Sequence, residues 1–283
     1  MAQAGRWLQG DDIRQSCSVV RGLFGRRLQS CANQMRLAFY SDQEIAANAP
    51  IDERVLRLIG VRRPQIGYVS SSPDPERSYF ERKRAYYERL GADLTVYLDA
   101  TSSDLDRDLG ALGRCDAIHL TGGNTFAFLR WLKARRILQM LRAYATEDRG
   151  VVIGTSAGAI LMTPTAETAL LCGDTRPPGA VDDEALGLVA FHFWPHYVPG
   201  AERVASVQSS IRKFPALYAC GDGTGIVISG AQVELYGAVS IAQQPVAADG
   251  DGLSAKARVA PICAERVGPR LRDIFALAGR SRR

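Results

Sequence analysis

A serine stands where a predicted strand meets a predicted helix. The motif Gly-Thr-Ser-Ala-Gly at 154–158 follows the β-branched run 151–153 and precedes an apolar segment with helical spacing. Glycines on both sides of Ser156 match a nucleophile elbow, a strained turn that presents the serine hydroxyl at the carboxyl edge of a sheet. The amide of Ala157, at the start of the helix, can help to bind an oxyanion. The pattern predicts acyl transfer with Ser156 as the nucleophile.

A second glycine-rich loop, Thr-Gly-Gly-Asn-Thr at 121–125, also lies between a predicted strand and a predicted helix. A glycine such as Gly123 lets the backbone approach a substrate closely, so its amide could supply a second oxyanion donor. A phosphate cradle is the competing use. The loop lacks both the Lys-Ser/Thr of a P-loop and the spacing of a dinucleotide-binding loop. On its own, this motif leaves both uses open.

A nucleophilic serine needs a base, and the chain has three histidines. His119 lies within a predicted buried strand, where histidine is more often part of the core. His192 and His196 lie near the end of a later strand, and Pro195 stiffens the backbone before His196. These positions favour His196 as the base over His192, which we expect to be a packed strand residue.

The base in turn needs a carboxylate that orients its ring and stabilises the imidazolium. Asp222 lies in Gly-Asp-Gly at 221–223, and Asp174 lies in Cys-Gly-Asp at 172–174. Both follow apolar segments, and either could be a turn-forming aspartate. Spacing in the sequence does not choose between them. The acidic run 182–184 is typical of a solvated loop.

Strands that alternate with helices must position these residues. Such alternation implies crossover connections and an α/β fold with a mostly parallel sheet between helices. The predicted strands span 36–40, 65–70, 94–98, 117–120 and 151–153, and the predicted helices span 51–59, 76–90, 105–112 and 126–143.

Beyond residue 165 the pattern changes to short strands separated by glycine and proline. Strands are predicted at 187–193, 225–229 and 233–238, a surface turn at 247–252 and a final helix at 271–277. We expect this half to form the far edge of the same sheet, with antiparallel strands. We also expect an N-terminal extension over 1–35 and a single α/β domain over 36–283.

Composition narrows the function classes. The formal net charge is +5, but much of it lies at the two ends of the chain, which gives little support to nucleic-acid binding. No apolar run approaches the roughly 20 residues of a membrane span. Six scattered cysteines lack the close pairs of a zinc site and suit a reducing cytoplasm. We therefore expect a cytoplasmic protein, a monomer or homodimer, with no metal or organic cofactor.

The motifs taken together resemble the peptidase S51 family, which includes aspartyl dipeptidase (peptidase E) and cyanophycinase. The resemblance covers about residues 36–240. It rests on four motifs in family order: Gly-Gly-Asn-Thr at 122–125, Gly-Thr-Ser-Ala-Gly-Ala at 154–159, Pro-His-Tyr at 195–197 and Gly-Asp-Gly at 221–223. It implies a class I glutamine-amidotransferase-like sheet in a flavodoxin-like three-layer sandwich, with serine where that wider group has cysteine.

The resemblance also implies roles for individual residues. Ser156 would be the nucleophile, His196 the base and Asp222 the acid, with Asp174 as the alternative acid. Gly123 and Ala157 would form the oxyanion site. The substrate-binding residues would be Gly122, Asn124, Thr125 and Arg203, the last in a place comparable to that of the arginine by which the dipeptidase recognises an N-terminal aspartate.

The expected function is a serine peptidase acting on small peptide substrates, in particular dipeptides with an N-terminal aspartate or a similar residue. Asn124-Thr125 is similar to the dipeptidase, whereas cyanophycinase-like members tend to have glutamine after the asparagine. Three alternatives remain. They are a cyanophycinase-like exopeptidase acting on β-aspartyl-arginine, an α/β-hydrolase esterase that would use Asp174 as its acid, and a binding protein without activity.

Overall fold

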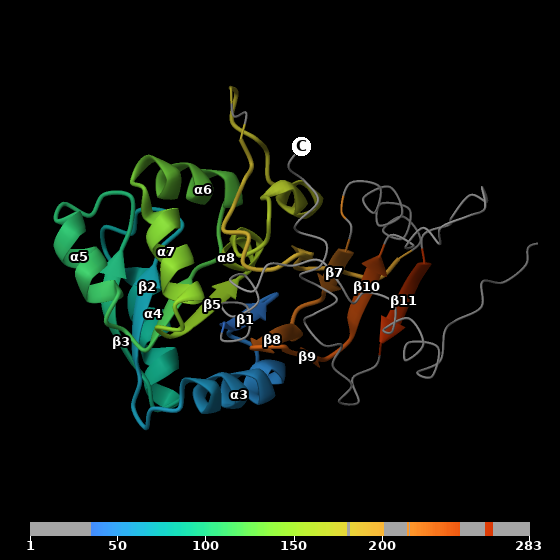
Figure 1. The fold of residues 1–283 in the computed structure, drawn as a ribbon, viewed down its shortest axis with the longest axis horizontal. Helices are drawn as coiled ribbons and strands as arrows, with labels where there is room; N and C mark the ends of the chain where they lie inside the picture. Colours follow the sequence, from blue (N-terminus) through green and yellow to red (C-terminus); the bar gives the residue numbers. More distant parts are fainter. Residues whose placement is uncertain (1–34, 180–181, 201–213, 215, 244–257, 263–283) are drawn as a thin grey trace, which may run out of the picture.

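The computed structural model describes residues 35–179, 182–200, 214, 216–243 and 258–262. Its main element is a seven-stranded sheet with the order β3-β2-β4-β5-β1-β8-β9 (Figure 1). Strands β3, β2, β4, β5 and β1 are parallel, whereas β8 and β9 are antiparallel. The strands are β1 (Arg36–Tyr40), β2 (Gln65–Val69), β3 (Asp93–Leu98), β4 (Ala117–Leu120), β5 (Val151–Thr155), β8 (Gly225–Ser229) and β9 (Gln232–Tyr236).

Helices cover both faces of this sheet because its strands are apolar on both sides. Along β1, Leu37 and Phe39 belong to one core cluster, and Ala38 and Tyr40 belong to another on the opposite face. The first face packs against α5 (Leu105–Leu112), α6 (Thr125–Ala134), α7 (Ile137–Thr146) and α8 (Ala157–Leu161), and the second packs against α3 (Ala49–Ile59) and α4 (Ser78–Arg89). The predicted α/β fold with a mostly parallel sheet between helices is confirmed.

A second, four-stranded sheet replaces part of the predicted far edge. Its order is β11-β10-β7-β6, and it lies beside the main sheet (Figure 1). Its strands are β6 (His192–Trp194), β7 (Ala216–Cys220), β10 (Val239–Gln243) and β11 (Arg258–Ile262). The rings of Phe191 and Phe193 lie 5.4 and 5.6 Å from that of Phe39 and join the two sheets. The predicted strand 187–193 is therefore wrong in its extent and in its sheet.

The predicted helix 126–143 is also wrong, because two helices fill this segment. Helix α6 ends at Ala134 with Arg135 as its C-cap, and Arg136 has a left-handed φ of 57° before α7 begins. The predicted turn 247–252 and helix 271–277 lie outside the described residues, as does the extension except for Met35. The division into an extension and one domain stays a prediction. Within the described part of the chain, every helix is too short or too polar to cross a bilayer.

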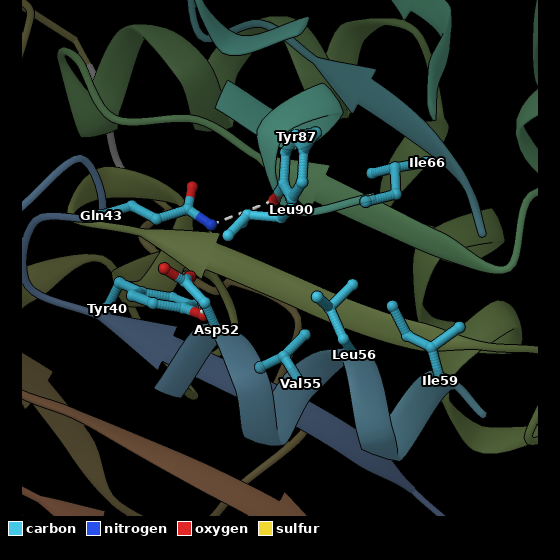
Figure 2. Close-up of a pocket in the computed structure, with 9 residues that line it drawn as sticks. All are labelled: Tyr40, Gln43, Asp52, Val55, Leu56, Ile59, Ile66, Tyr87 and Leu90. Atoms are coloured by element: carbon cyan, nitrogen blue, oxygen red, sulfur yellow. Dashed lines mark hydrogen bonds between the residues drawn. The ribbon is translucent and has the colours of Figure 1, made fainter. Parts of the chain in front are cut away.

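A buried polar network lies between the sheet and the helices α3 and α4. The Tyr40 hydroxyl donates to Asp52 Oδ1 at 2.9 Å, and Gln43 Nε2 donates to the Tyr87 hydroxyl at 3.1 Å (Figure 2). The Tyr87 hydroxyl also lies 2.7 Å from His119 Nδ1, whose other ring nitrogen is 3.3 Å from Thr155 Oγ1. The Tyr86 hydroxyl contacts both Asp52 Oδ2 and the Gln43 carbonyl oxygen, so this network reaches from α3 to the residue that precedes Ser156.

Burial sets the protonation state of this network. His119 is fully buried, and loss of hydration together with the nearby charge of Lys83 holds its pKa well below the ordinary value. His119 is therefore neutral in the folded protein, and its two ring nitrogens offer one donor and one acceptor to Tyr87 and Thr155.

Acidification should destabilise the protein through His119. Below the ordinary histidine pKa of about 6.5 the unfolded chain takes up a proton that the folded chain does not, so unfolding becomes easier as the pH falls. We expect wild type to lose up to about 2 kcal/mol more unfolding free energy between pH 7 and pH 5 than His119→Gln. Urea unfolding at the two pH values measures this difference, and contributions from Asp52 and His192 cancel because both proteins contain them. Equal losses would contradict the assignment.

Candidate active site

The turn between β5 and α8 holds Ser156 in a strained conformation. Its φ of 49° and ψ of −108° are rare for a residue with a side chain. Close packing against neighbouring backbone requires glycine at both glycine positions of the motif. A Cβ on Gly154 would lie 2.6 Å from the Ala159 nitrogen, and one on Gly158 would lie 2.1 Å from the Leu120 carbonyl oxygen. Only glycine at these positions lets α8 pack so closely on the strands.

His196 lies just after β6 and reaches the serine. Its Nε2 is 2.8 Å from Ser156 Oγ. The backbone of His196 is also left-handed, with a φ of 56°, and the next residue is held because the Tyr197 amide donates to the Cys220 carbonyl at 3.0 Å. Ser156 and His196 thus come together in backbone conformations that ordinary loops avoid.

Asp222, in the loop after β7, is the aspartate that contacts His196. Its Oδ1 lies 2.6 Å from His196 Nδ1. A carboxylate only accepts hydrogen bonds, so Nδ1 carries the proton and donates to it. The other nitrogen, Nε2, is then free to accept the Ser156 hydroxyl proton. The three side chains form a continuous hydrogen-bonded chain in the order and tautomer that a serine nucleophile requires.

This chain of side chains lies at the surface. The side chains of His196 and Asp222 are 43% and 49% exposed. Even as an ion pair, side chains this exposed would contribute about 1 kcal/mol or less to stability. A 2.6 Å pair that adds so little to the stability of the fold is better explained by chemistry than by structure.

Asp174 lies elsewhere, at the start of α6. Its Oδ2 accepts a hydrogen bond from the Thr125 amide at 2.7 Å, and its Oδ1 is 3.5 Å from Asn124 Nδ2. The Asn124 side chain also caps α6 by accepting from the Ala127 amide at 2.8 Å. Thr125 is buried, which differs from its expected role on a substrate-binding surface. Asp174 and Thr125 hold the glycine loop in place.

The glycine loop packs directly against the nucleophile. A Cβ on Gly122 would lie 3.5 Å from that of Ser156. Gly123 has a φ of +129°, and a Cβ there would overlap Ser71 Oγ at 2.2 Å. Neither the Gly123 amide nor the Ala157 amide donates a hydrogen bond to another described residue. Because α8 has only five residues, any anion stabilisation at its start comes mainly from the Ala157 amide itself.

The remaining candidates lie apart from this cluster. His119 belongs to the buried network, and His192 is buried with its Nε2 3.2 Å from Thr165 Oγ1. Burial lowers the pKa of His192 to about 4. Arg203 lies outside the described residues. Where the structure is described, no group of three or more His, Cys, Asp and Glu side chains is arranged to hold a metal ion.

Sequence reasoning missed Ser41, which follows β1. Its hydroxyl donates to Asp222 Oδ1 at 2.9 Å and accepts from the His196 amide at 2.7 Å. The available signal was its position as the first polar residue after a central parallel strand, at the edge where Ser156 was expected.

Comparison with known proteins decides the family. A model of peptidase family S51 matches residues 40–236, a stretch that contains Ser156, His196 and Asp222. The chain belongs to peptidase family S51. The match spans well over half of the chain, from the end of β1 to the end of β9.

Individual relatives match shorter parts of the chain. An uncharacterised peptidase of Listeria innocua is 32% identical over 120 residues, which cover 42% of this chain and 56% of that protein. The match thus spans only just over half the length of this relative. A Drosophila melanogaster protein named "Probable alpha-aspartyl dipeptidase" is 35% identical over 88 residues, 31% of this chain and 35% of that one.

The fold of this S51 chain also has a solved counterpart. A Listeria monocytogenes structure described as a "Putative Peptidase E Protein" superposes with a TM-score of 0.58 at 22% identity, and the match covers 71% of this chain and 97% of that one. At that identity the similarity shows a shared fold.

The two aspartates should respond differently to replacement by asparagine. Asp222→Asn keeps the size of the side chain but removes the charge that orients and stabilises the His196 ring, so kcat should fall by about 10²- to 10⁴-fold. Asp174→Asn keeps an oxygen that can accept from the Thr125 amide, so kcat should stay within about 10-fold of wild type. Steady-state kinetics on one peptide substrate measures both. A larger loss in Asp174→Asn than in Asp222→Asn would make Asp174 the acid.

Proposed function

We propose that this chain is a serine peptidase that hydrolyses short peptides, in particular dipeptides with an N-terminal aspartate or a similar residue. The observation that carries the proposal is the chain of hydrogen bonds from Ser156 Oγ through His196 to Asp222, with distances of 2.8 and 2.6 Å. This chain of hydrogen bonds begins at Ser156, on a strained elbow, and the protein is a member of family S51.

Acylation follows from this geometry. His196 Nε2 takes the Ser156 hydroxyl proton as Oγ attacks the peptide carbonyl carbon, and Asp222 stabilises the imidazolium that forms. The carbonyl oxygen becomes an oxyanion, for which the amides of Gly123 and Ala157 are the available donors. One such donor is typically worth about 10²- to 10³-fold in kcat.

Completion of the reaction uses the same groups in reverse. The imidazolium of His196 gives its proton to the departing amine, which leaves Ser156 as an acyl ester. Water then attacks the ester carbonyl while His196 takes a proton from it, and the proton returns to Ser156 Oγ as the acid product leaves. The residues named here account for every proton transfer.

Two observations support a small peptide with N-terminal aspartate. The pair Asn124-Thr125 is similar to that of the dipeptidase, and the Drosophila relative is named for alpha-aspartyl dipeptides. The structure adds that Asn124 caps α6 and that Thr125 is buried, so the pair acts by shaping the loop beside Ser156. Arg203 stays a proposal for recognition of the aspartate carboxylate.

The cyanophycinase-like alternative has weaker support. A substrate with arginine calls for an acidic surface, and the acidic run 182–184 is the candidate for one. Asp182 pairs with Lys133 at 2.7 Å, and Asp183 accepts from Arg176 Nε at 2.7 Å. Two of the three carboxylates in this run are thus already neutralised by basic side chains.

An esterase of the α/β-hydrolase type is also less favoured. It needs the acid to precede the histidine in the chain, which requires Asp174 next to His196. Asp174 instead accepts from the Thr125 amide. A binding protein that lost activity would not need the Ser156–His196–Asp222 geometry and is tested below.

A dipeptide panel tests the proposal. Wild type and Ser156→Ala are assayed with Asp-Leu, Asn-Leu, Ala-Leu and β-Asp-Arg, with amine release as the readout and thermal unfolding as the folding control. We expect wild type to cleave Asp-Leu faster than Asn-Leu, which lacks only the charge. Ser156→Ala should lose about 10³-fold or more in kcat, because removal of the nucleophile leaves only binding and the oxyanion donors.

Other outcomes assign other functions. Preference for β-Asp-Arg would identify a cyanophycinase-like exopeptidase. Cleavage that survives in Ser156→Ala would eliminate Ser156 as the nucleophile. If wild type cleaved none of the four peptides and did not react with a small fluorophosphonate, the binding-protein alternative would replace the proposal.

A further inference from the structure

The three residues of the proposed triad come from separate segments of the chain and meet at the end of β1. Ser156 follows β5, His196 follows β6 and Asp222 follows β7. The Ser156 amide donates to the Tyr40 carbonyl at 2.9 Å. Ser41, the next residue, contacts the other two members. Two consecutive residues at the end of β1 therefore touch all three.

The hydroxyl of Ser41 joins the base to the acid. The His196 amide can only donate, and it lies 2.7 Å from Ser41 Oγ. The Asp222 carboxylate only accepts, and its Oδ1 lies 2.9 Å from the same oxygen. One hydroxyl thus holds the backbone of His196 and the side chain of Asp222 at the same time. The Ser41 hydroxyl thus donates its hydrogen to Asp222 and accepts with one of its two lone pairs from His196.

Ser41 is itself firmly held and has no surface for a substrate. It is 0% exposed, and its amide donates to the Thr224 carbonyl at 3.2 Å. His196 and Asp222, in contrast, project from loops and are nearly half exposed. The end of β1 is therefore held in place by the sheet, whereas His196 and Asp222, the two groups that must be positioned, lie on loops.

We infer that Ser41 is a positioning residue, which sets the distance between His196 Nδ1 and Asp222 Oδ1. The inference rests on the proposed function and deepens it. The Asp222 oxygen that accepts from His196 also accepts from Ser41, so the hydroxyl sets where that oxygen lies. Misplacement of a catalytic group by about 1 Å can cost about 10²-fold in rate, and loss of this hydroxyl frees both partners.

Ser41→Ala tests the inference, with Ser70→Ala as the matched control. Ser70 is a buried serine that follows β2, a parallel strand of the same sheet that β4 and β5 separate from β1, and its hydroxyl donates to the Ser72 carbonyl at 2.7 Å, away from the triad. We expect kcat of Ser41→Ala to fall by about 10- to 100-fold with KM within about twofold, because Ser41 does not touch substrate. Ser70→Ala should keep its kcat. Equal losses of kcat in the two variants would overturn the inference.

A double-mutant cycle separates positioning from general destabilisation. If Ser41 acts through Asp222, then Ser41→Ala should cost less than about threefold in kcat when Asp222 is already asparagine. A loss in the Asp222→Asn background as large as in wild type would show that Ser41 acts by another route and would overturn the inference.

A measurement without substrate distinguishes failure of the inference from failure of the proposed function. The Nδ1 proton of His196 gives a downfield proton resonance when it is held by a carboxylate, and its loss in His196→Gln assigns it. We expect Ser41→Ala to shift or broaden this resonance and Ser70→Ala to leave it unchanged. This result would support Ser41 even if wild type cleaved no peptide. An unchanged resonance in Ser41→Ala would overturn the inference while leaving the peptidase proposal intact.

Discussion

The register of β1 against its two neighbours places the whole candidate site. Tyr40 pairs with Thr155 of the parallel strand β5 and with Gly225 of the antiparallel strand β8. The elbow that follows β5 and the loop that precedes β8 are therefore level with Ser41. A slip of one residue would exchange Leu37 and Phe39 with Ala38 and Tyr40 between two faces that are packed around side chains of different shape. It would also break the hydrogen bond from Tyr40 to Asp52, so the register is strongly specified. Packing of the core thus fixes the position of chemically active groups at the edge.

Much of the fold and of the candidate site could be predicted from the sequence because residues that are close together in the chain determine it. The β-branched run before Ser156 and the glycines around it predicted the elbow, and both glycines prove to be required by contacts under 3 Å with neighbouring backbone. Strand β8 and helix α5 begin and end where their patterns predict. Local residues specify these elements. Where two backbone segments pack too closely for a side chain, the glycine that this packing requires is visible in the sequence.

The rest depends on contacts that sequence patterns do not encode. The apolar spacing continues on both sides of Arg135 and Arg136, and neither glycine nor proline marks the break between α6 and α7. An alternating strand pattern states which face is apolar but not which sheet it joins, which is why β6 was assigned to the wrong sheet. Spacing also could not separate Asp222 from Asp174, because the distinction lies in which loop reaches His196 in space. Ser41 was missed for the same reason, since its partners are far along the chain.

These partners lie far apart along the chain, and this separation determines the stage of folding at which the candidate site forms. Ser41 lies 155 positions from His196 and 181 positions from Asp222. Such contacts form only after the loops between them have closed, and that step is slow because it must overcome a large loss of chain entropy. A chain that has folded only its first strands and helices holds Ser41 and Ser156 without the imidazole and carboxylate that complete the site. The hydrogen-bonded arrangement of Ser156, His196 and Asp222 therefore appears only in the finished fold, and a growing or partly unfolded chain carries no assembled candidate site.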